Sequence, residues 1–137
     1  MPEVIPLGGE LRFLGMILEA GASDMRLRLF KNDVTVDQGS SIGDFEEADF
    51  SGYEQAPLTW GEPYPAGFGY ATADAEQVDF LHDGGPVSNV IYGYLIVDSV
   101  ANKILYGDNF DPPALMEEEG DSVQVEPKLN LSDAWDV

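Results

Sequence analysis

The sequence has no cysteine, a single histidine and few basic residues. Without cysteine, the chain cannot form a disulfide framework, a thiolate zinc site or a cysteine nucleophile. Its one histidine, His82, is not accompanied by a serine-nucleophile motif, so nothing indicates a serine-hydrolase triad. His82 ends a strand-like run and precedes Asp83-Gly84-Gly85, so we expect it at the surface or capping a turn.

Other signs of chemistry are also missing or weak. No glycine-rich phosphate-binding motif stands between a strand-like and a helix-like segment. Paired carboxylates serve glycoside hydrolases, but with 26 acidic residues some pairs will approach by chance. The segment Asp108–Asp111 has the oxygen-rich composition of a calcium loop without the EF-hand pattern. We therefore expect a protein that is not an enzyme and has no catalytic residue, metal or cofactor.

No apolar run is long enough to span a membrane. The N-terminal stretch MPEVIPLGG has neither the basic flank nor the apolar core of a signal peptide. We expect the protein to be made and kept in a cytoplasm unless it leaves on or inside a larger particle.

The charge is strongly one-sided, with 26 acidic residues against 6 basic ones and a net charge of −20. This charge repels phosphate backbones and anionic lipids, so we expect neither nucleic acid nor membrane as a partner. It either keeps an exposed protein soluble, or complements a basic partner surface or cations.

A chain of 137 residues is long enough to bury a sizeable core as one domain. We predict an extended lead over residues 1–8, a single domain over 9–131 and an acidic tail over 132–137. Gly8–Ala20 predicts a short helix with a stripe at Leu11, Leu14 and Leu18, which Phe13, Met16 and Ile17 widen. A strand over Leu11–Leu18 is the competing interpretation, because Gly15 weakens a helix.

The stretch from Val87 to Phe110 predicts a central hairpin. Asn89–Val97 is apolar at both alternating positions, which is typical of a strand covered on both faces. Asp98–Asn102 supplies turn residues, and Lys103–Tyr106 begins a second strand. We predict a loop over Asp108–Pro113 and a separate short strand over Ala114–Glu117.

Short strand-like runs recur along the rest of the chain, with proline interrupting the last of them at Pro127. Their regular spacing favours a mainly β fold, an antiparallel β-sandwich of the jelly-roll or immunoglobulin type with one short N-terminal helix. The remaining strand candidates are Met25–Lys31, Gly52–Trp60, Phe68–Thr72, Glu76–His82 and Ser122–Leu131.

Two groups of residues are candidates for contacts with other molecules. Aromatic side chains gather in a stretch rich in glycine and proline, and they either pack the end of the domain or contact a ligand such as a glycan. These are Trp60, Tyr64, Phe68 and Tyr70. The chain ends are candidates for a partner interface, through Val4, Ile5, Leu7 and Trp135; Trp135 either inserts into a neighbouring chain or folds back on its own domain.

Stretches of this sequence, taken in order, resemble a group of small virion proteins of tailed bacteriophages. They are LRLFKNDV at 27–34, DFEEADFSGY at 44–53, FLHDGGPVSNVIYGYLIV at 80–97 and SVQVEPKLNL at 122–131. The resemblance spans roughly residues 8–131, and it rests on the ordered set rather than on any single motif.

The resemblance implies a non-enzymatic structural component of the virion, most similar to capsid decoration or cement proteins that bridge major capsid subunits and stabilise the head. It implies assembly in the host bacterial cytoplasm, a final location on the capsid surface, and a homo-oligomer, expected to be a trimer. A receptor- or glycan-binding module on the tail or head surface is the alternative.

Overall fold

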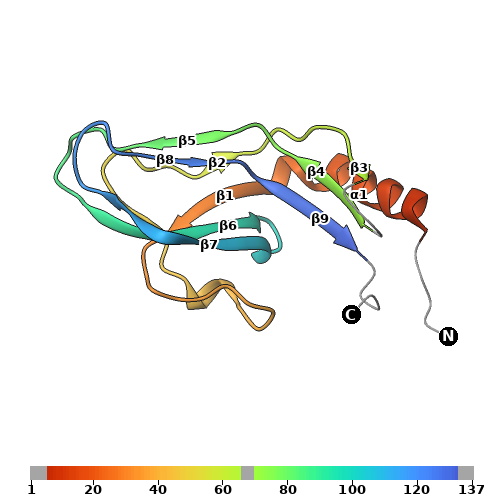
Figure 1. Cartoon of the computed structure of the whole chain (residues 1–137). Coiled ribbons are helices and arrows are strands. Elements are labelled where there is room, and N and C mark those ends of the chain that lie inside the picture. Colours follow the sequence, from red (N-terminus) through yellow and green to blue (C-terminus); the bar gives the residue numbers. More distant parts are fainter. Residues whose placement is uncertain (1–5, 66–69, 133–137) are drawn as a thin grey trace. The chain divides into compact units, whose positions relative to one another are not determined.

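In the computed structural model, which describes residues 6–65 and 70–132, the chain is mainly β-strand in antiparallel sheets, with one α-helix at the N-terminus (Figure 1). The predicted mainly β fold with a short N-terminal helix is confirmed. The chain divides into two compact units, each built from segments that are distant in sequence. The first comprises Met1–Ser23, Leu58–Gln77 and Glu126–Val137, and the second comprises Asp24–Pro57 and Val78–Val125. The prediction of one domain over residues 9–131 stays a prediction.

The first unit consists of a helix packed on a three-stranded sheet of order β3-β4-β9. Ala71 and Ala73 are fully buried in the middle strand, where their small side chains allow close packing. The Thr72 hydroxyl donates a hydrogen bond to the Leu129 carbonyl at 3.1 Å, which satisfies a buried polar group. The elements are α1 (Leu7–Gly21), β3 (Tyr64–Pro65), β4 (Tyr70–Asp74) and β9 (Lys128–Ser132).

Helix α1 buries a narrower face than the sequence predicts. Leu14 and Leu18 are buried as expected, together with Glu10 of the first turn. Phe13, Met16 and Ile17, which we expected to widen this buried stripe, point outward instead and are nearly half exposed. Helical periodicity identifies apolar positions, but only the neighbouring sheet determines how many of them are covered. No helix in the described ranges is long and apolar enough to cross a bilayer.

The second unit is built on a four-stranded antiparallel sheet of order β2-β1-β6-β7. Strand β6 is central and pairs with β1 on one side and β7 on the other. Ile91, Leu95 and Val97 are buried on one face of β6, as predicted. On the other face Ile96 is buried, Tyr92 and Tyr94 are partly buried and Val90 is 39% exposed, so the predicted covering of both faces is found only in part. The elements are β1 (Met25–Phe30), η2 (Ile42–Asp44), β2 (Ala56–Pro57), β5 (Val78–Leu81), β6 (Asn89–Asp98), β7 (Lys103–Met116) and β8 (Ser122–Val125); η1 (Ala22–Asp24) is the short turn before β1.

The hairpin is longer than the sequence predicts. Asp98–Asn102 forms the expected turn: the Asp98 carboxylate accepts hydrogen bonds from the N–H groups of Val100 and Ala101, both at 2.9 Å. The predicted loop at Asp108–Pro113 and the predicted separate strand at Ala114–Glu117 are wrong, because Lys103–Met116 is one strand. Aspartate and proline are local turn signals, and here the pairing with β6 overrides them.

An aromatic layer joins the two sheets of this unit. Tyr53 lies in the segment after β1; its hydroxyl accepts a hydrogen bond from the Leu29 N–H at 3.2 Å and donates one to the Glu47 carboxylate at 2.8 Å. The Tyr53 ring stacks on Phe80 of the β5–β8 pair. Phe50 stacks on His82 beside it. Within this unit, two antiparallel sheets therefore share an aromatic core.

The closest backbone approach in the sheet occurs at Gly93 of β6. A Cβ atom at this position would overlap the Asp108 carbonyl oxygen and would lie 2.6 Å from the Phe30 ring. The ladder between β6 and β7 shifts register beside this glycine, as is typical of a bulge. Glycine therefore lets β1, β6 and β7 come together here.

We predict that Gly93→Ala destabilises the protein by about 1–3 kcal/mol or more, because the methyl group would overlap a backbone oxygen and a buried ring. Chemical denaturation measures the loss. The matched control is Gly43→Ala in η2, where an added Cβ meets nothing within 4 Å. Equal stability of the two variants would contradict this account of the sheet.

Candidate functional site

A shallow groove in the first unit lies between α1 and the segment Trp60–Pro63. Its volume is about 270 Å³, and Gly15, Leu18 and Glu19 line the helix side. Trp60 is held in place by an isolated antiparallel bridge to Ala75. The Trp60 indole N–H is buried and has no hydrogen-bond partner among the described residues. The groove thus combines the aromatic residue Trp60 with the carboxylates of Glu19 and Glu62.

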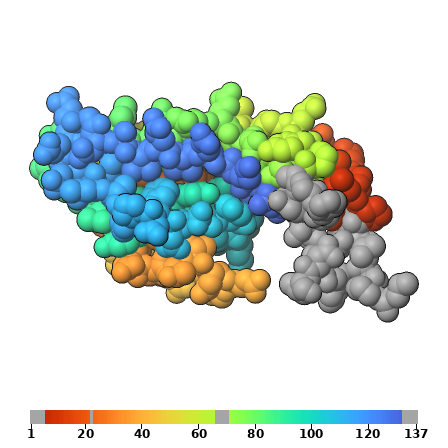
Figure 2. All heavy atoms as spheres, viewed as in Figure 1, coloured from red at the N-terminus to blue at the C-terminus, as the bar shows by residue number. Residues whose placement is uncertain are grey.

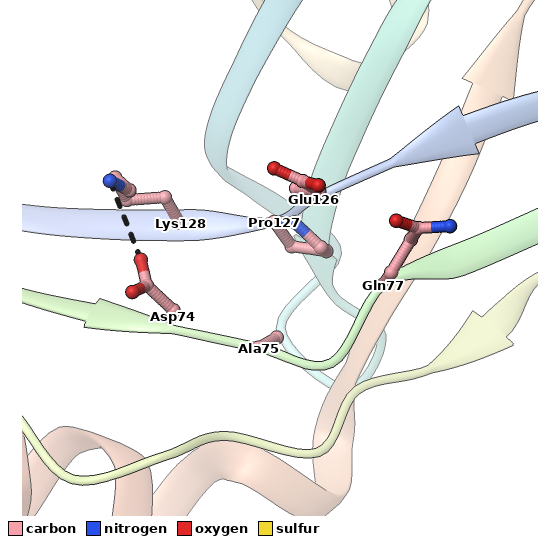
Figure 3. A pocket seen from close by; sticks show the side chains of 6 residues that line it. All are labelled: Asp74, Ala75, Gln77, Glu126, Pro127 and Lys128. Carbon is pink, nitrogen blue, oxygen red and sulfur yellow. Dashed lines mark ion pairs between the residues drawn. The ribbon is translucent and has the colours of Figure 1, made fainter.

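A second hollow of about 340 Å³ lies in the same unit, between the ends of β4 and β9 (Figure 3). Lys128 and Asp74 face each other there as an ion pair, with 3.5 Å between Nζ and Oδ1. Gln77 and Glu126 lie at its other end, past Pro127 (Figure 3). The Tyr64 hydroxyl donates a hydrogen bond of 2.6 Å to the other Asp74 oxygen.

These contacts perturb the titration of both partners of Asp74. The hydrogen bond to Asp74 raises the pKa of Tyr64, because ionising the phenol would place two negative charges together. The charge of the same carboxylate raises the pKa of Lys128. Asp74 is thereby engaged by two side chains, so the cluster ties β3, β4 and β9 together and does not present a free carboxylate.

The structure brings together only part of the predicted aromatic group. Trp60 lines the groove, whereas Tyr64 is exposed and directed to Asp74. Tyr70 begins β4, and its backbone pairs with Ser132. Phe68 lies outside the described residues.

The predicted interface at the chain ends is represented in the described residues by Leu7 alone. Leu7 is the first residue of α1 and has 36% of its surface exposed. Val4, Ile5 and Trp135 lie outside the described residues.

His82 is buried and has a structural role. Its Nδ1 accepts a hydrogen bond from the Gly84 N–H at 3.0 Å, so the ring proton sits on Nε2 and is donated to the Val87 carbonyl at 2.9 Å. Turn capping is therefore correct, and the alternative of a surface position is wrong, because only 2% of the residue is exposed. With both nitrogens bonded to the backbone, the imidazole can abstract a proton only by breaking a bond that holds the turn.

Many of the carboxylates that give the chain its charge pin turns. The Asp121 carboxylate accepts hydrogen bonds from the N–H groups of Glu117 and Glu118, which lowers the pKa of Asp121. The hydrogen bond from Asn89 similarly lowers the pKa of Asp49. Within residues 6–65 and 70–132, no group of three or more acidic or histidine side chains is arranged to hold a metal ion.

Side-chain amides hold the long acidic loop between β1 and β2, a feature that the sequence analysis missed. The Asn109 amide accepts a hydrogen bond from the Val36 N–H at 2.9 Å and donates one to the Val34 carbonyl at 2.8 Å. Asn32 forms an equivalent pair with Glu46 and Asp44. Figure 2 shows part of this loop (orange) lying against β7 (teal to blue).

A third amide completes these contacts. Asn89, at the start of β6, accepts a hydrogen bond from the Asp49 N–H and donates one to the Asp49 carboxylate. Nothing local in the sequence reveals that Asn109 would face this loop. Within the oxygen-rich stretch Asp108–Asp111, the Asn109 amide therefore organises the backbone of the loop.

Comparisons with known proteins found no matching family model, no similar curated protein and no similar solved structure. No relative therefore assigns a role to any residue of this chain.

We predict that Asn109→Asp destabilises the fold by roughly 1–3 kcal/mol, because a carboxylate would lose the donated hydrogen bond and face the Val34 carbonyl. Thermal and urea unfolding measure the effect. Asn130→Asp on β9 makes the same chemical change at an exposed position and should be nearly neutral. An equal effect of the two variants would show that charge, and not the bonds to the loop, is responsible.

Proposed function

We propose that the protein is a non-enzymatic structural component of a tailed-phage virion, a capsid decoration or cement protein that binds the major capsid protein at the head surface. The observation that carries this proposal is that the residues of the motifs shared with phage virion proteins have structural roles. LRLFKNDV contains the last four residues of β1, and DFEEADFSGY supplies aromatic residues that pack between the sheets of the second unit. The shared pattern therefore describes a scaffold and not a reactive site.

The polar residues of these motifs support the same interpretation. Asn32 and Asn89 bond to the backbone of the acidic loop, and His82 bonds to the backbone around its own turn. A cement protein needs a rigid body with a surface complementary to its partner rather than a reactive group. These three motif residues therefore have structural roles that need no chemistry.

The charge supplies the attraction to the capsid in this proposal. The turn Glu117–Glu119 exposes three adjacent carboxylates, whereas the Asp121 carboxylate caps this turn. Such a surface is drawn to basic patches on a partner. The trimeric state stays a prediction that rests on the resemblance alone.

The test is co-sedimentation of the purified protein with capsids that lack it. We expect saturable binding that weakens as salt rises, and reduced binding of the triple variant E117Q/E118Q/E119Q. Virions lacking the protein should lose infectivity faster on heating and osmotic shock. Absence of co-sedimentation, or unchanged resistance of the deficient virions, would overturn the proposal.

A glycan-binding module is the second candidate, and the Trp60 groove favours it. Sugars stack on aromatic faces, and Trp60 lines this groove. This candidate predicts binding on a glycan array that Trp60→Ala reduces by about tenfold, since the aromatic surface is lost. The control is Tyr106→Phe on β7 in the other unit, and an array without binding would count against this candidate.

A further inference from the structure

The outward face of α1 carries an apolar stripe that nothing in the described structure covers. Phe13, Met16 and Ile17 are 49%, 46% and 45% exposed. They are spaced three and four residues apart, with Ala20 continuing the row, so they lie on one side of the helix. Leu14 and Leu18, on the adjacent side, are buried in the first unit.

The exposed surface of α1 around this stripe carries no net charge, in contrast to the rest of this acidic chain. The exposed charged residues of α1 are Arg12 and Glu19, which cancel, while the chain as a whole carries −20. Two copies of the chain repel each other over most of their surface, and a neutral apolar face is where that repulsion is weakest. Charge depletion around an apolar centre is the compositional mark of a protein interface.

Arg12 and Glu19 are seven residues apart, so they flank the same side of the stripe, two helical turns from each other. When two identical helices pack antiparallel about a two-fold axis, the flanks on the same side meet. A register that places Phe13 of one copy level with Met16 of the other leaves Arg12 and Glu19 on the same edge of the pair, offset by two residues, or about 3 Å along the axis, which their long side chains span. By symmetry the ion pair forms twice.

Parallel packing does not bring Arg12 of one copy to Glu19 of the other. In a parallel pair, or in three helices around a three-fold axis, the flank that carries Arg12 meets the opposite flank of its neighbour. That flank holds Ile17 of the next copy, so the guanidinium would face an apolar side chain and find no partner.

We propose that α1 is a self-association surface, and that two copies of this chain pair antiparallel through Phe13, Met16 and Ile17, with Arg12 of each copy opposite Glu19 of the other. The pair is two-fold, in contrast to the trimer that the phage resemblance implies. The inference does not depend on capsid binding. A single pair of 15-residue helices is a small interface, so we expect a weak dimer whose population rises with concentration.

Sedimentation over a concentration series at fixed ionic strength tests the pair by charge exchange. Glu19→Arg should weaken self-association by about tenfold, because arginines would then face each other at both sites. The double variant Arg12→Glu/Glu19→Arg should restore the affinity, since it recreates both ion pairs with reversed polarity. The control Glu54→Arg makes the same charge change at an exposed position in the other unit and should leave association unweakened.

Met16→Glu should hold the protein monomeric, because it places like charges in the centre of the stripe, and circular dichroism checks that each exposed-site variant remains folded. Since the chain has no cysteine, a mixture of Phe13→Cys and Met16→Cys chains should form a mixed disulfide faster than either alone. The proposal would be overturned if the protein stayed monomeric at all concentrations or formed a species of three copies. It would also be overturned if the double variant did not recover the affinity, or if single cysteine variants crosslinked with themselves faster than with each other.

Discussion

The close approach of β1, β6 and β7 at Gly93 is the constraint on which the second unit depends. Only a residue without a side chain leaves room for both the Asp108 carbonyl and the Phe30 ring. The approach keeps β6 paired on both edges, so its backbone groups are satisfied, and one of its faces buries Ile91, Leu95 and Val97. Phe30, Leu95 and Val97 then form a core against which the loop residues Val36, Ile42 and Phe45 pack.

The acidic loop between β1 and β2 is ordered by bonds rather than by regular structure. A long loop carries backbone groups that need partners, and Asn32, Asn89 and Asn109 supply them. Aspartates do the same at the turns that Asp98 and Asp121 close. Part of the negative charge is thus a by-product of how the turns are built.

Prediction from sequence succeeded where the signal is local and failed where it is not. The periodicity of α1, the alternation of β1 and the turn at Asp98–Asn102 each show in a few neighbouring residues, and all three are found. Strand β7 was divided wrongly because Asp108–Pro113 has the composition of a loop, and its pairing partner lies elsewhere in the chain. Of the candidate site, Trp60 was identified from its aromatic neighbours, whereas its pairing with Ala75 across the sequence was not.

The sequence by itself determined the mainly β class, the N-terminal helix and the central strand, because propensity and hydrophobic period depend on residues close together in the chain. It also determined the strong negative charge and the absence of cysteine chemistry. Only the tertiary structure decided which apolar side of α1 is covered and which faces outward, since burial depends on what packs against the helix. It likewise decided that His82 is an internal turn cap, because its partners Gly84 and Val87 are backbone groups that only the folded turn brings to the ring.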